Sequence, residues 1–167
     1  MILNEESTTR VLSIYPTVRG FGFSVFEGPQ NPIDWGANTV RIKKNKVSLE
    51  KIERLIDFYS PEVVITEKAE DSGSRRCERI ASLLDDIEDL CDRKNQKLIS
   101  YTRKAVSDVF DTFGVSTKHE IARKISIWLP SLAPYLPQPR KPWMSEDYRM
   151  AIFDAMALSM TYFYSEE

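Results

Sequence analysis

Two carboxylates in this sequence, Glu67 and Asp154, occupy positions from which they could bind a metal ion. Glu67 follows the short, largely β-branched run 62–66, which is typical of a buried parallel strand, so the strand would present this acid at its carboxyl end. Asp154 lies in an otherwise apolar part of a predicted helix, where an aspartate needs a partner or a role. Carboxylate oxygens are the ligands that Mg²⁺ prefers. The alternatives are an ordinary charged strand end for Glu67 and a purely structural partner for Asp154.

The only histidine, His119, is a further candidate. It stands in the first turn of a predicted helix, behind a capping box in which Thr117 is the cap and Glu120 lies three residues on. A histidine can bind a metal or act as a base. The second position of a capped helix nevertheless favours a surface location for His119.

Residues 10–28 are expected to position these side chains. They predict two antiparallel strands, because the β-branched and aromatic runs on either side are separated by a turn region with Pro16 and Gly20. The first strand is apolar on both sides of its axis, as in the centre of a covered sheet. Tyr15, at its end, would therefore be held rigidly at the sheet surface.

The remaining pattern predicts an α/β fold with a mixed five-stranded sheet flanked by helices. The further elements expected are a strand at 33–42, a helix at 49–59 capped by Ser48, the strand at 62–66, a helix through 77–91, a strand at 97–101, helices near 103–112 and from 117, and a last helix from Ser145 to about 164. Five prolines between 129 and 144 forbid regular structure and predict a rigid loop before that last helix.

This order of elements, with several short motifs, resembles the RuvC-like Holliday junction resolvases of the RNase H-like superfamily. The resemblance spans about residues 10–164. It depends on the strand end Ile14-Tyr15-Pro16, the strand start Gly20-Phe21-Gly22, Glu67, the pair Gly114 and Lys118, and Asp154-Ala155-Met156-Ala157 in the last helix. It implies an RNase H-like fold, with branched DNA as ligand, a role in DNA recombination and a homodimeric assembly.

The resemblance also implies roles for particular residues. Resolvases bring carboxylates from separate elements together to hold Mg²⁺ or Mn²⁺, which activates water for phosphodiester cleavage. Glu67 and Asp154 match two of these metal-binding and catalytic positions. Lys118 matches a catalytic lysine near the scissile phosphate, although a solvated first-turn lysine is an equal alternative.

Three departures from the family pattern weaken the implied catalytic site. Tyr15 replaces the family's first aspartate, and a phenol with a pKa of about 10 is neutral at pH 7 and a poor Mg²⁺ ligand. Ala151 stands where the resolvases carry another acid, and Ser107 replaces a basic residue. Glu70, Asp71 and Asp147 are possible substitute acids, but their spacing does not favour any of them. A metal is therefore expected to bind weakly or not at all.

Nucleic-acid binding must come from local charge, because the formal net charge is −2. The basic residues expected around the sheet edge of Glu67 and Asp154 are Lys43, Lys44, Arg75, Arg76 and Lys118. Trp143 and Tyr148 flank the end of the proline loop and could stack on an unpaired base. Packing of that loop on the body of the protein is the alternative expectation.

Three functional hypotheses follow. The first is a RuvC-like protein that recognises branched or structured DNA and whose nuclease activity is lost or reduced because the first acid is Tyr15. The second is an active Mg²⁺- or Mn²⁺-dependent junction endonuclease that takes its missing acid from Glu70, Asp147 or a partner chain. The third is a protein-interaction module that keeps only the scaffold.

Length and composition are compatible with all three hypotheses. A chain of 167 residues predicts one domain, over 10–167, after a flexible N-terminus at 1–9. Cys77 and Cys91 would lie roughly 21 Å apart on one helix, too far to form a disulfide. The sequence shows no secretory signal and no run long enough to span a membrane, so a cytoplasmic location is expected.

Overall fold

The computed structural model describes residues 8–68 and 78–165. Within these residues, five strands form one mixed sheet in the order β3-β2-β1-β4-β5. The strands are β1 (Arg10–Pro16), β2 (Gly20–Glu27), β3 (Pro32–Thr39), β4 (Val63–Glu67) and β5 (Leu98–Tyr101). The first three strands are antiparallel, whereas β4 is parallel to both β1 and β5. The predicted α/β class and mixed five-stranded sheet are confirmed.

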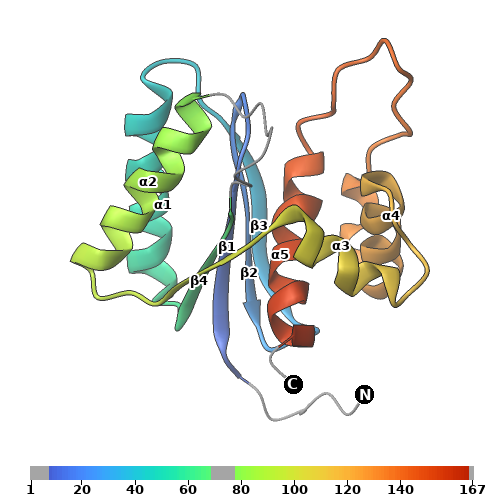
Figure 1. The fold of residues 1–167 in the computed structure, drawn as a ribbon, viewed down its shortest axis with the longest axis horizontal. Helices are drawn as coiled ribbons and strands as arrows, with labels where there is room; N and C mark the ends of the chain where they lie inside the picture. Colours follow the sequence, from blue (N-terminus) through green and yellow to red (C-terminus); the bar gives the residue numbers. More distant parts are fainter. Residues whose placement is uncertain (1–7, 69–77, 166–167) are drawn as a thin grey trace.

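Helices cover both faces of the sheet (Figure 1). One face packs against α1 (Lys44–Tyr59) and α2 (Glu78–Arg93), and α5 (Met150–Ser165) lies on the other face, with α3 (Arg103–Asp111) and α4 (Lys118–Trp128) beyond it. A short 3₁₀ helix, η1 (Pro130–Tyr135), follows α4, so the prediction that the prolines after 129 forbid regular structure is wrong over these residues. None of the helices in the described ranges is long and apolar enough to cross a membrane.

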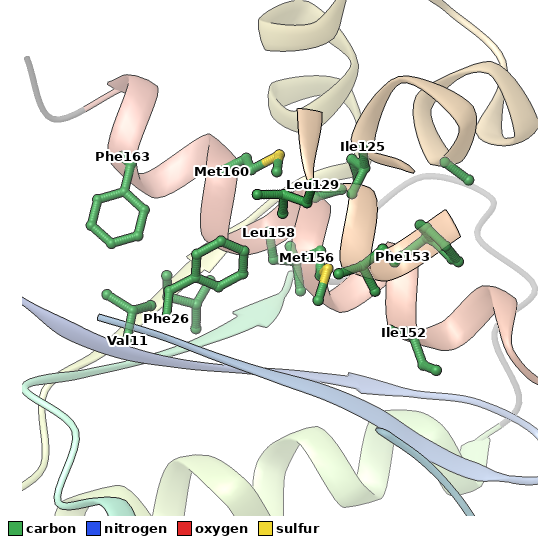
Figure 2. Packing of buried hydrophobic residues seen from close by; sticks show 14 of the residues in the cluster. Val11, Phe26, Ile125, Leu129, Ile152, Phe153, Met156, Leu158, Met160 and Phe163 are labelled. Carbon is green, nitrogen blue, oxygen red and sulfur yellow. The ribbon is translucent and has the colours of Figure 1, made fainter. Parts of the chain in front are cut away.

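The alternation of side chains along β1 decides which face receives Tyr15. Leu12 and Ile14 belong to the apolar cluster under α1 and α2, whereas Val11 belongs to the cluster under α5. Because successive strand residues point to opposite faces, Tyr15 points to the α5 face and packs against that cluster. Figure 2 shows Val11 and Phe26 of the sheet facing Phe163 of α5.

Helix α5 lies unusually close to the sheet. A Cβ atom built on Gly22 would lie 2.2 Å from the Ala151 carbonyl oxygen, so only glycine fits there. Further along the helix, the buried Ser159 hydroxyl lies 2.6 Å from the Ser13 hydroxyl and 3.2 Å from that of Ser24. These hydrogen bonds satisfy three polar groups that would otherwise be costly to bury. The contacts fix both the depth and the register of α5.

Two predicted helix starts are wrong. Helix α1 begins at Lys44, and Ser48 is buried inside it rather than capping it; the residue before the helix, Lys43, has a left-handed φ of 48°. Helix α5 begins at Met150, five residues after Ser145. The capping box of Thr117 and Glu120 is confirmed in both of its hydrogen bonds. Cys77 lies outside the described residues.

We expect Gly22→Ala to destabilise the protein by about 3 kcal/mol or more, because the added methyl group would push α5 away from the sheet. Gly114→Ala is the matched control. Gly114 has nothing within 4 Å of its would-be Cβ and a φ of 78°, so alanine there costs only about 1–2 kcal/mol of backbone strain. Urea denaturation measures both changes. A smaller loss for Gly22→Ala than for Gly114→Ala would contradict this close packing.

Candidate functional site

Two strand ends bring Tyr15 and Glu67 to the same edge of the sheet. Strands β1 and β4 run parallel, with Ile14 opposite Thr66, so the next residue of each strand emerges at that edge. Tyr15 points to the α5 face, and Glu67 is largely buried, with 9% of its surface exposed. Glu67 therefore lies at the carboxyl end of β4, as the sequence predicted.

Helices α4 and α5 bring the other two residues to this edge. Lys118, the first residue of α4, is positioned by the Thr117 cap. Its Nζ lies 3.0 Å from Asp154 Oδ2 and 2.8 Å from Glu146 Oε1. The same Nζ lies 5.4 Å from the centre of the Tyr15 ring, within the range of a cation–π contact. A lysine ammonium thus stands between two carboxylates and over the ring of Tyr15.

A pocket of about 320 Å³ opens over this arrangement. The lining includes Tyr15, Glu67, Lys118 and Asp154, so the structure brings the three predicted catalytic residues together with Tyr15. The basic residues Arg103 and Lys104 of α3 and the hydroxyl residues Ser107 and Ser116 line it as well. A pocket with several cations and hydroxyl groups beside buried acids can hold an anion such as a phosphate.

Burial governs the electrostatics of Asp154, whose side chain is 10% exposed. Burial raises the pKa of its carboxyl group to about 7; Lys118 opposes this rise, and Glu146 and Glu67 add to it. Among the described residues, no donor makes a well-directed hydrogen bond to Oδ2, so the contact with Lys118 is an ion pair. Burial lowers the pKa of Lys118, but Asp154, Tyr15 and Glu146 together raise it above the usual value.

The described residues supply fewer acids than the metal site that the resemblance implies. Within residues 8–68 and 78–165, no group of three or more acids, histidines or cysteines is placed to hold a metal ion. Mg²⁺ takes oxygen ligands at about 2.0–2.1 Å, and the Lys118 ammonium, 3.0 Å from Asp154 Oδ2, would repel an ion bound there. Ala151 carries no carboxylate, and it packs against Gly22.

The other predicted residues lie around the site or away from it. Lys43 and Lys44 stand at the start of α1, where Lys44 Nζ donates to the Val18 carbonyl in the turn after β1. Neither lysine lines the pocket, and their role in binding stays a prediction. His119 Nε2 lies 3.2 Å from the Pro137 carbonyl oxygen, and Asp147 pairs with Arg149. Arg75, Arg76, Glu70 and Asp71 lie outside the described residues.

Sequence reasoning missed three residues of the site. Glu146 stands in the loop before α5 and has no motif, so only its contact with Lys118 identifies it. Arg103 and Lys104 had a usable signal, because adjacent basic residues begin the helix that directly follows β5. Because β5 lies beside β4, a basic pair directly after β5 is placed near the end of β4, where the pocket opens.

The raised pKa of Asp154 predicts a pH dependence of stability. Between an unfolded pKa of about 3.9 and a folded pKa of about 7, the native protein binds more protons at Asp154 than the unfolded chain does. Its contribution to stability therefore falls as pH rises through this window, by up to about 1.4 kcal/mol per pH unit. Asp154→Asn removes this contribution, so we expect its stability relative to the native protein to increase from pH 5 to pH 8.

Urea denaturation of both proteins, in EDTA, measures this difference. Asp108→Asn is the control, because Asp108 is an exposed carboxylate paired with a lysine, Lys104. A constant difference between the native and Asp154→Asn proteins across the range would show that Asp154 does not titrate there.

Comparisons with known proteins agree with this geometry. No protein-family model matches the sequence, and no curated protein matches it significantly. Among solved structures, RuvC of Thermus thermophilus superposes with a TM-score of 0.66 at 17% identity, covering 95% of this chain and 96% of that one. The same protein in complex with a Holliday junction substrate gives a TM-score of 0.69 at 15% identity, covering 94% of each chain.

A mitochondrial resolvase also superposes on this chain. The yeast mitochondrial Holliday junction resolvase Ydc2 superposes with a TM-score of 0.62 at 14% identity, over 96% of this chain and 82% of that one. These superpositions extend over nearly the whole chain, although the sequences have diverged far. The chain therefore has the RNase H-like fold of the RuvC-like Holliday junction resolvases, as the sequence motifs predicted.

Proposed function

We propose that this protein recognises branched DNA and that its nuclease activity is lost or strongly reduced. Two proteins with this fold, from Thermus thermophilus and fowlpox virus, have been solved with Holliday junction DNA. The pocket at the ends of β1 and β4 carries basic residues at its rim and buried acids at its base. This arrangement supports phosphate binding without supplying a complete metal site.

The observation that carries the proposal is the position of the Lys118 ammonium. It lies 3.0 Å from Asp154 and 2.8 Å from Glu146, where it neutralises the acids with a charge from the protein itself. A divalent cation at Asp154 would be repelled by this ammonium in an environment of low polarity. The two carboxylates that match the family, Glu67 and Asp154, are too few to overcome that repulsion, because Mg²⁺ gives up its water reluctantly.

The DNA surface that we propose extends from the pocket along the sheet edge. Arg103 and Lys104 are exposed at the pocket, and Lys43 and Lys44 stand at the start of α1, near the turn that follows β1. Contacts of this kind bind phosphates without reading sequence. We also propose a homodimer, because the resemblance to resolvases, which present two equivalent sites to two strands of a junction, implies that assembly.

The first test compares a four-way junction, a linear duplex and a single strand at stated salt concentrations, in EDTA, Mg²⁺ and Mn²⁺. We expect selective binding of the junction and no cleavage in any of these buffers. Metal-dependent cleavage would instead support the active endonuclease, with a substitute acid. Absence of both binding and cleavage would support the protein-interaction module.

The same assay tests the basic residues of α3. Arg103→Gln with Lys104→Gln should reduce the slope of log affinity against log salt by about two, because two phosphate contacts are lost. The matched control is Lys51→Gln with Arg54→Gln on α1, which covers the other face of the sheet and does not line the pocket. Equal slopes for the two double variants would remove α3 from the interface.

The second test asks what prevents metal binding. Tyr15→Asp restores the missing acid, and Lys118→Gln removes the competing ammonium. We expect 10 mM Mg²⁺ to leave the melting temperature of the native protein unchanged and to stabilise the double variant by about 1.4 kcal/mol if its Kd is about 1 mM. Tyr15→Asp alone should show a smaller shift, because Lys118 still competes.

Tyr15→Phe with Lys118→Gln is the control, since it removes the ammonium without adding an acid. A Mg²⁺-dependent rise in the native protein would show that its metal site is complete. No rise in the Tyr15→Asp, Lys118→Gln protein would show that Tyr15 does not occupy the position of the family's first metal ligand.

A further inference from the structure

The loop before α5 carries an exposed aromatic arm, which we define as residues 138–145. Every residue of this arm is exposed, whereas Pro137, just before it, is buried. Trp143 is 78% exposed, so the expectation that the proline loop packs on the body of the protein is wrong for this residue. Figure 1 shows the loop rising beside the start of α5 and extending away from the helices.

The arm is attached to the candidate site at both ends. Pro137, the residue before the arm, is held by His119, whose Nε2 lies 3.2 Å from the Pro137 carbonyl oxygen. Glu146, the residue after the arm, is held by Lys118, whose Nζ lies 2.8 Å from Glu146 Oε1. Lys118 and His119 are consecutive residues at the start of α4, so the two attachments lie next to each other. The arm therefore projects from the rim of the pocket.

The backbone of the arm is restrained although its side chains are exposed. Pro139 and Pro142 each fix one φ angle, which lowers the entropy that the arm loses on binding. The Met144 amide donates to the Lys141 carbonyl at 2.9 Å, which closes a turn around Trp143. A large aromatic ring is thus presented to solvent on a short, stiffened projection.

The charge of the arm identifies the kind of partner. Residues 138–145 contain Arg140 and Lys141 and no acidic residue. Lys141 Nζ lies 5.4 Å from the centre of the Trp143 ring, so a cation and an aromatic face share the tip. Phosphates next to a flat base match this combination, because cations bind the backbone and the ring stacks on the base.

We propose that Trp143 stacks on an unpaired base at the branch point of DNA, while Arg140 and Lys141 contact the neighbouring phosphates. The proposal rests on the proposed function, because it needs a branched ligand at the pocket. An opened base pair at a branch exposes a base face that a linear duplex keeps stacked. The arm thereby favours branched over linear DNA without reading a base sequence.

The experiment uses the full chain and a four-way junction that carries the fluorescent base 2-aminopurine at the branch point, beside a linear duplex. We expect Trp143→Ala to weaken junction binding by about 5- to 150-fold, the range found for one stacked base. Duplex binding should change far less. Trp143→Phe should recover part of the loss, and 2-aminopurine quenching by the native protein should vanish with Trp143→Ala.

Phe58→Ala is the matched control, because Phe58 is 79% exposed on α1, which covers the other face of the sheet. It should leave binding and quenching unchanged. The melting temperature of Trp143→Ala should equal that of the native protein, which separates lost binding from lost folding.

Equal junction binding by the native and Trp143→Ala proteins would overturn the proposal and leave the proposed function intact. The prolines at 139 and 142 would then favour a protein ligand that binds extended, proline-rich segments. Equal losses on junction and duplex would also overturn it, since the contact would not depend on a branch. If the native protein binds no form of DNA, both the arm proposal and the proposed function fail.

Discussion

The close approach of α5 to the sheet is the constraint on which the site depends. Gly22 allows the backbone at Ala151 to touch β2, and the hydroxyl contacts of Ser159 set the position of the helix along the strands. Once α5 lies at this depth, Asp154 is placed under the pocket at the ends of β1 and β4 and is removed from water. A buried carboxylate needs a compensating cation or a proton.

That cation determines what the site can do. Lys118 supplies a fixed positive charge 3.0 Å from Asp154 Oδ2 and 2.8 Å from Glu146 Oε1. Tyr15 offers its ring face to the same ammonium. The ion pair of Lys118 with Asp154 thus compensates a carboxylate that would be costly to bury alone.

Sequence reasoning recovered the fold and the residues that regular elements carry. Alternation along β1, the β-branched run before Glu67 and the capping box before Lys118 each define a local geometry, and the sheet order then brings their ends together. Asp154 was identified because a charge in an apolar helix is conspicuous.

Contacts made by residues in irregular loops could not be predicted from the sequence. Glu146 lies in a loop whose path follows from packing rather than periodicity, so its pairing with Lys118 had no signal. The exposure of Trp143 is of the same kind, since the prolines predicted a rigid loop but not its direction. The start of α1 was misplaced because Ser48, a good capping residue, is buried one turn inside the helix.

The balance of charge around the pocket favours phosphate binding without a metal. Three carboxylates, from Glu67, Glu146 and Asp154, face three basic side chains, from Arg103, Lys104 and Lys118. Because burial raises the pKa of Asp154 to about 7, this carboxyl takes up a proton as the pH falls below neutral, and the set then becomes more positive. Like charges repel, so acids left without a cation would oppose a phosphate at this pocket. The Lys118 ammonium beside Asp154 and Glu146 reduces that repulsion, and this is the physical basis on which we propose phosphate binding here.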